Sequence, residues 1–171
     1  MEITKEAIIA SLNETTKGLL QAIMSFSPEQ LNEVPFEGSW TAAQVAEHVL
    51  KSEKGFGNIW QGHAAPTEGN PGERVPIIES IFLNFDIKLK SPDFILPTDG
   101  WHDKERLYND LKNNRLKLKQ LAETVDLNQT FTDFEMPQMG YLTGVEGASF
   151  IICHSKRHIH QMEKIYEALV G

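Results

Sequence analysis

The chain has 171 residues, with 16 Lys and Arg against 24 Asp and Glu, so its formal net charge is −8. This length suits a single domain, residues 1–171, whose core is large enough to fold without disulfides or a structural metal. The acidic balance argues against a nucleic-acid-binding protein, because Lys and Arg supply most of the affinity for nucleic acid. The apolar runs are too short to cross a membrane. We therefore expect neither nucleic acid nor a membrane as a partner.

The N-terminal segment, Met1–Glu6, alternates in charge and lacks the basic start and the apolar core of a signal peptide. The single cysteine, Cys153, has no second cysteine with which to form an internal disulfide. Both features favour a cytoplasmic protein.

Helical periodicity dominates the first 60 residues and the last 70. A first helix is predicted from Thr4 to about Ser25, because its apolar residues recur at intervals of three and four. A second helix begins after Thr41, since Thr41 and Gln44 have the form of a capping box. The predicted buried stripe of this second helix is Val45, His48, Val49, Ser52, Phe56 and Trp60.

Gly and Pro are frequent between residues 62 and 100, which predicts irregular structure around a short helix near residues 77–85. A third long helix is predicted from Asp103 to about Val125. A final helix follows the capping-box sequence that begins at Thr143 and runs towards Val170. Four long amphipathic helices with few strand signals predict an all-α protein. Its fold class would be a four-helix bundle with a loop-rich, partly helical insertion between the second and third long helices.

Three of the six histidines fall on predicted buried faces. His154 and His158 are four residues apart, so they leave the same face of the final helix in successive turns. His48 lies on the buried face of the second helix. Imidazoles in an apolar core are costly unless they are hydrogen-bonded or coordinated. The residues alone leave two interpretations open: hydrogen-bonded core histidines, or a metal site, since neutral imidazole binds Zn, Ni and Fe well.

Two further side chains are candidates for contacts with a ligand or a substrate. Gln161 returns to the face of the final helix that carries the histidines, where it could hydrogen-bond a ligand or simply pack. Trp40 precedes the second helix and could form a pocket wall or cap the end of the bundle. Glu47 lies about 100° from His48 around the helix. The general base is therefore unassigned, and no catalytic residue is named.

The segment Trp40-Thr41-Ala42-Ala43-Gln44-Val45-Ala46-Glu47-His48 resembles the Trp-Ser/Thr-x-x-(Glu/Gln)-x-x-x-His element in the second helix of DinB-like proteins. This superfamily includes the YfiT-type metal-dependent hydrolases. The segment His154-Ser155-Lys156-Arg157-His158-Ile159-His160-Gln161 resembles the final-helix His-x-x-x-His-x-x-Gln element of the same proteins. The two elements stand in the family's order, about a hundred residues apart, and the resemblance covers nearly the whole chain.

The resemblance implies a four-helix bundle, often dimeric, with a three-histidine metal site carried here by His48, His154 and His158. Members of known activity are mostly transferases or isomerases that use mycothiol, bacillithiol or a similar small thiol. Metal coordination deprotonates a thiol, and an open position on the same site could instead activate water. We therefore expect a divalent transition metal (Zn or Ni before Fe), a low-molecular-weight thiol, a small-molecule substrate and a homodimer. The alternative is a non-catalytic bundle that binds a metal or ligand, or that only dimerises.

Overall fold

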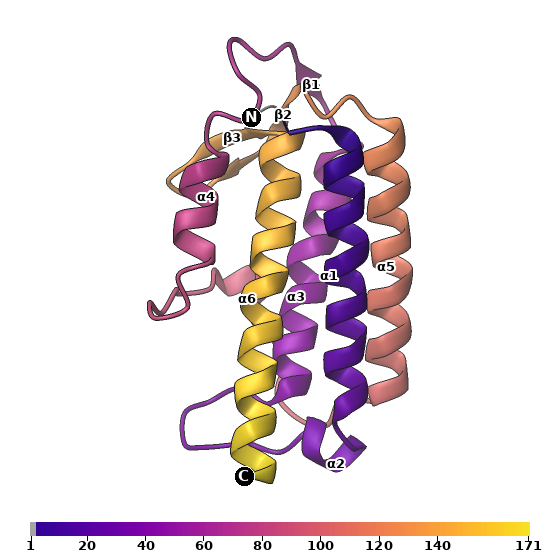
Figure 1. Ribbon diagram of the computed structural model, residues 1–171, viewed down its shortest axis with the longest axis vertical. Helices are drawn as coiled ribbons and strands as arrows, with labels where there is room; N and C mark the ends of the chain where they lie inside the picture. The colour runs from indigo at the N-terminus through magenta and orange to yellow at the C-terminus, as the bar shows by residue number, and fades with distance from the viewer. Residues whose placement is uncertain (1–2) are drawn as a thin grey trace.

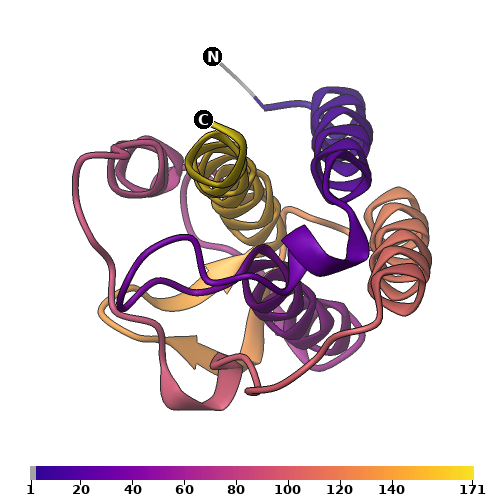
Figure 2. The ribbon, with the colours of Figure 1, turned by 90° about the horizontal axis from the view of Figure 1, so that it is seen from below.

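The computed structural model describes residues 3–171; the first two residues of the N-terminal segment and of the predicted domain, Met1 and Glu2, lie outside the described residues. Four long helices run side by side along the long axis (Figure 1). They are α1 (Lys5–Ser25), α3 (Ala42–Ile59), α5 (Lys104–Thr124) and α6 (Gly144–Val170). Both α1 and α3 pack against α5 and α6, as the end-on view shows (Figure 2). All four predicted long helices are therefore present.

The long helices form because their apolar residues share one face and their ends are capped. The spaced apolar residues of α1 and of α5 are buried: Ile8, Leu12, Leu19 and Ile23 in α1, and Leu107, Leu111 and Leu118 in α5. A fully buried aliphatic side chain contributes about 1.5–3 kcal/mol. The hydroxyls of Thr41 and Thr143 each accept a hydrogen bond of 3.1 Å, from the backbone N–H of Gln44 and Glu146 respectively. The two predicted capping boxes are confirmed, and they fix where α3 and α6 begin.

A small antiparallel sheet lies at one end of the long helices (Figure 1), and the prediction of an all-α protein missed it. Its strands, in the order β1-β2-β3, are β1 (Ala64–Ala65), β2 (Thr130–Met136) and β3 (Gly140–Thr143). The pairing of β2 with β3 shifts register between Thr130 and Glu135. Such a shift breaks the alternation of apolar and polar residues that normally reveals a strand. The protein is therefore mostly helical, with a small sheet.

The predicted insertion between the second and third long helices is confirmed as loop-rich and partly helical. It contains α4 (Val75–Phe82), which packs on α6, and the short 3₁₀ helix η1 (Asp93–Ile95), which contacts α3. One further short helix, α2 (Pro28–Leu31), follows α1. The connection from α4 to α5 runs along the α3 and α6 side of the helices (Figure 2). Within residues 3–171, no helix is both long enough and apolar enough to span a bilayer.

A buried ion pair lies among the four long helices. Glu53 of α3 and Arg115 of α5 are only 1% and 3% exposed, and their charged atoms are 2.5 Å apart. The Arg115 guanidinium also donates to the hydroxyl of Thr15 on α1, at 2.9 Å, and to the hydroxyl of Ser155 on α6. Each long helix therefore contributes at least one polar side chain to a single network.

Removing one partner of this pair is expected to destabilise the fold strongly. Arg115→Met leaves the Glu53 carboxylate buried without a cation, which costs about 3–5 kcal/mol. Urea denaturation measures the change in the free energy of unfolding. Arg106→Met, which removes an exposed arginine from the same helix, is the matched control and should change stability little. The double variant Glu53→Leu/Arg115→Met should recover much of the loss. A single variant as stable as the wild type would contradict the assigned role of the pair.

Candidate metal centre

The three histidines singled out in the sequence come together between α3 and α6. The Nε2 atom of His154 lies 3.1 Å from that of His48 and 3.1 Å from that of His158. Their side chains are almost fully buried, with residue exposures of 2%, 5% and 7% for His48, His154 and His158. Two imidazole nitrogens bound tetrahedrally to zinc at ~2.0–2.1 Å lie about 3.3 Å apart. The spacing of the nitrogens therefore fits a group that could hold a divalent metal.

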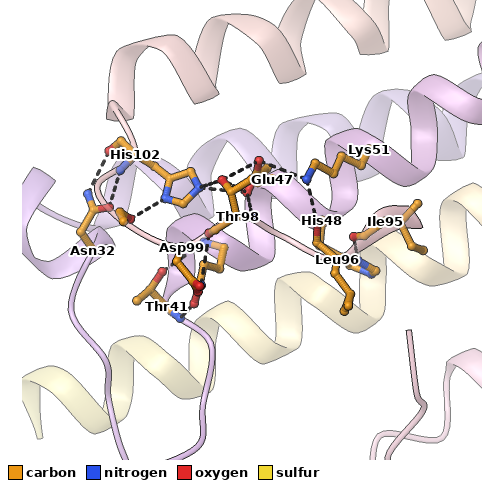
Figure 3. Close-up of polar contacts among 12 residues, drawn as sticks. Asn32, Thr41, Glu47, His48, Lys51, Ile95, Leu96, Thr98, Asp99 and His102 are labelled. Carbon is orange, nitrogen blue, oxygen red and sulfur yellow. Dashed lines mark hydrogen bonds and ion pairs between the residues drawn. The ribbon is translucent and has the colours of Figure 1, made fainter. Parts of the chain in front are cut away.

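The Nδ1 atom of His48 faces the backbone of the connection between α4 and α5. It lies 2.9 Å from the carbonyl oxygen of Ile95 (Figure 3). A carbonyl oxygen only accepts hydrogen bonds, so Nδ1 must carry the hydrogen. In the neutral ring, Nε2 then carries a lone pair. That lone pair is directed at the other two histidines.

The Nδ1 atom of His158 is fixed by a neighbour on its own helix. It lies 2.7 Å from the amide oxygen of Gln161, three residues further along α6. This oxygen accepts the hydrogen of Nδ1, so the neutral His158 ring also carries its lone pair on Nε2. Gln161 therefore orients His158 within the same helical turn.

His154 lacks such a partner. Its Nδ1 atom is buried and has no hydrogen-bond partner among the residues that the structure describes. The ring instead stacks on Phe150, with ring centroids 5.1 Å apart and an interplanar angle of 18°. Phe82 of α4 approaches the same ring edge-on at 6.1 Å. Aromatic contacts, rather than a hydrogen bond to Nδ1, therefore hold this imidazole.

Burial lowers the pKa of all three imidazoles. The pKa of His48 falls although its hydrogen bond to Ile95 opposes the shift. Burial, followed by the neighbouring histidines, holds the pKa of His154 well below its usual range. Burial together with the charge of His48 lowers the pKa of His158 to about 3. At neutral pH all three rings are therefore neutral, which is the form that binds a metal.

The ring of Trp40, the other candidate for a ligand or substrate contact, lies beside that of His48, with centroids 5.1 Å apart. The remaining three histidines lie elsewhere: exposed His63 pairs with Asp133, His102 pairs with Glu47, and His160 stacks on Phe85. Cys153 is buried, and burial raises the pKa of its thiol.

Within residues 3–171, no carboxylate or thiol joins the three-histidine group. The Ile95 carbonyl had no sequence signal, because every residue carries the same main-chain acceptor.

The lowered pKa values predict that the metal-free protein loses stability in acid. In the unfolded chain a histidine has a pKa near 6.5, so the unfolded state takes up protons first as the pH falls. The stability contributed by the neutral rings is therefore complete above about pH 6.5 and declines towards the lower folded values. With a folded pKa of about 3, His158 alone should account for a loss of about 2 kcal/mol between pH 7 and pH 5.

Urea denaturation of chelator-treated protein at both pH values measures this loss. His158→Gln should show a smaller dependence of stability on pH than the wild type. The matched variant His63→Gln, which replaces an exposed histidine, should retain the wild-type dependence. Identical pH dependence in wild type and His158→Gln would show that His158 does not contribute.

Comparison with known proteins agrees with this geometry. The family model of the DinB superfamily matches residues 11–162, a range that begins in α1, ends in α6 and includes all three histidines. No curated protein and no solved structure matches the chain. Because the family model covers most of its length, the chain belongs to the DinB superfamily.

Proposed function

We propose that His48, His154 and His158 hold one divalent transition metal, and that the chain uses this centre to act on a small-molecule substrate. Three protein ligands leave one coordination position open, as is typical of catalytic rather than structural sites. Three neutral imidazoles suit zinc or nickel, with iron as a further candidate. The four long helices would then form the four-helix bundle that the family resemblance implies.

The proposal rests most directly on the hydrogen bonds made by the Nδ1 atoms. His48 and His158 each donate through Nδ1, so two lone pairs converge on Nε2 of His154. That nitrogen offers at most one hydrogen, which two acceptors at 3.1 Å would have to share. A cation bound by three lone pairs removes the conflict. Hydrogen-bonded core histidines explain the arrangement less well.

We propose a small thiol as the first candidate for the group that the centre activates, with water as the second. When bound, the metal supplies Lewis acidity, which deprotonates a coordinated thiol or lowers the pKa of water. Hydrolysis usually also employs a general base. The two acids nearest in sequence to His48 on α3 are already engaged, because Glu47 binds Thr98 and His102, and Glu53 binds Arg115. A thiol bound to the metal would release its proton to bulk water and react as the thiolate, so its activation would not require a side-chain base.

The residues around the centre would position the reacting groups and limit the entry of water. Ile95 and Gln161 hold the Nδ1 hydrogens of two imidazoles and so keep their lone pairs directed at one point. Trp40 and Phe82 pack against His48 and His154 and shield them from solvent. Family resemblance also supports a homodimer, whose stoichiometry light scattering would measure. The single cysteine supports a cytoplasmic location.

Loss of one ligand tests the metal centre. Wild-type protein loaded with zinc and passed over a desalting column should retain one zinc per chain by elemental analysis. His158→Ala should retain no more zinc than a chelator-treated sample, because two imidazoles bind a divalent cation far more weakly than three. His63→Ala is the matched control and should retain the wild-type content. Full occupancy in a folded His158→Ala variant would refute the assignment of this ligand.

Thiol chemistry separates the enzyme from a non-catalytic bundle. Zinc- or nickel-loaded wild type, mixed with a small cysteine-derived thiol and a panel of small electrophiles, should consume the thiol faster than the metal-free protein does. His154→Ala should show only the uncatalysed rate. The non-catalytic alternative would be favoured if the protein bound stoichiometric metal but neither consumed thiol in a metal-dependent way nor hydrolysed ester and amide probes.

A further inference from the structure

One face of α3 binds the segment that leads from η1 towards α5. Four side chains of this face bind the backbone or side chains of residues 95–99, and they follow the three- and four-residue spacing of a helix: Gln44, Glu47, His48 and Lys51. Figure 3 shows the last three of them beside this segment. We call residues 95–99 the strap. Ile95, whose carbonyl accepts the hydrogen bond from His48, is the first residue of the strap. The position of this carbonyl therefore depends on how the strap is held.

Side-chain packing contributes little to holding the strap. None of the residues from 92 to 100 is buried, and the side chains of Phe94 and Leu96 are exposed. Polar bonds from α3 take the place of packing. Lys51 donates to the carbonyl of Leu96 at 2.7 Å, and Gln44 donates to that of Thr98 at 3.3 Å.

Glu47 makes the largest set of these bonds. Its carboxylate accepts the backbone N–H of Thr98 at 2.7 Å and the Thr98 hydroxyl at 3.0 Å. It also lies 2.9 Å from the ring of His102 and 3.4 Å from the ammonium of Lys51. Partial burial works to raise the pKa of Glu47, but the bonds from Thr98 and His102 hold it below its ordinary value. One carboxylate therefore binds the strap, His102 and Lys51 at the same time.

The chain just beyond the strap is anchored independently. The side chain of Asn32 accepts the backbone N–H of His102 at 2.7 Å and donates to its carbonyl at 2.9 Å. The His102 ring is directed back at Glu47, with Nδ1 3.1 Å from the carbonyl of Gly100. Glu47 thus connects α3 with His102, which lies beyond the strap, and it binds Thr98 of the strap as well (Figure 3).

We propose that Glu47 is a positioning residue of the three-histidine centre. Through Thr98 it holds the strap so that the Ile95 carbonyl accepts the Nδ1 hydrogen of His48, and this bond directs the Nε2 lone pair at His154 and His158. The inference rests on the proposed metal centre. The inference gives a role to Glu47, which is adjacent to His48 in sequence but is not part of the three-histidine group.

Metal affinity and metal geometry test the inference together. Removing a group that orients a histidine ligand typically weakens metal binding about 10- to 100-fold. Because Glu47 acts through the strap, Glu47→Ala should weaken zinc binding by about tenfold, the lower end of that range. Competition with a chromophoric chelator measures the affinity. Cobalt(II) bound to the variant should show altered visible absorption bands, since these bands respond to ligand geometry.

Two further variants separate positioning from general effects. Glu47→Gln retains an oxygen that can accept the Thr98 N–H, so it should restore part of the affinity and the wild-type cobalt spectrum. Glu163→Ala removes the same charge from an exposed site on α6 and should bind zinc as the wild type does. If Glu47→Ala does not fold, Thr98→Val, which removes one bond to the carboxylate, is judged by the same two measurements.

The outcomes distinguish the two proposals. A wild-type protein that binds neither zinc nor cobalt would overturn the metal centre, and the role of Glu47 with it. A wild type that binds both, together with a folded Glu47→Ala variant of equal affinity and identical cobalt spectrum, would overturn the role of Glu47 alone. Weakened binding with a changed spectrum, partly restored by Glu47→Gln, supports the inference.

Discussion

The ion pair between Glu53 and Arg115 is the interaction on which the arrangement of the long helices depends. A buried charge left without its partner costs several kcal/mol, so a shift of one helix along another is penalised if it separates these groups. Thr15 and Ser155 extend the pair to α1 and α6. Apolar stripes alone tolerate small shifts, because one aliphatic contact replaces another at similar free energy. The polar network therefore selects one register among several that are compatible with the apolar core.

This register also determines where the histidines meet. Ser155 follows His154 directly, and successive residues on a helix differ by about 100° in direction. When Ser155 faces Arg115, its neighbour must face the side of the helices that α4 and the strap cover. On α3, Ser52 donates to the carbonyl of His48 and directly precedes Glu53. Glu53 and Ser155, which belong to the buried network, thus lie on faces of α3 and α6 adjacent to those that carry the three histidines. Fixing the network therefore orients the histidines.

Sequence reasoning succeeded where the position of a side chain follows helical periodicity. His48, His154 and His158 could be grouped because the spacing of a helix determines which side chains share a face. The Ile95 carbonyl could not be found in this way, because a main-chain acceptor in an irregular segment carries no residue-specific signal. The hairpin of β2 and β3 was missed because its register shift disrupts the alternation of a regular strand. Glu47 was placed correctly about 100° from His48, but its partner Thr98 lies 51 residues further along the chain.

The three imidazoles differ in what holds them, and this difference determines how changes elsewhere can reach the centre. His158 is oriented by Gln161 on the same helix, and His154 stacks on Phe150, four residues before it. Both contacts are made within α6 itself, and Phe82 of α4 adds a further contact to His154. The His48 ring depends instead on a carbonyl of the strap, which no buried side chain anchors. A substitution that displaces the strap would therefore move His48 more than it moves the two histidines of α6.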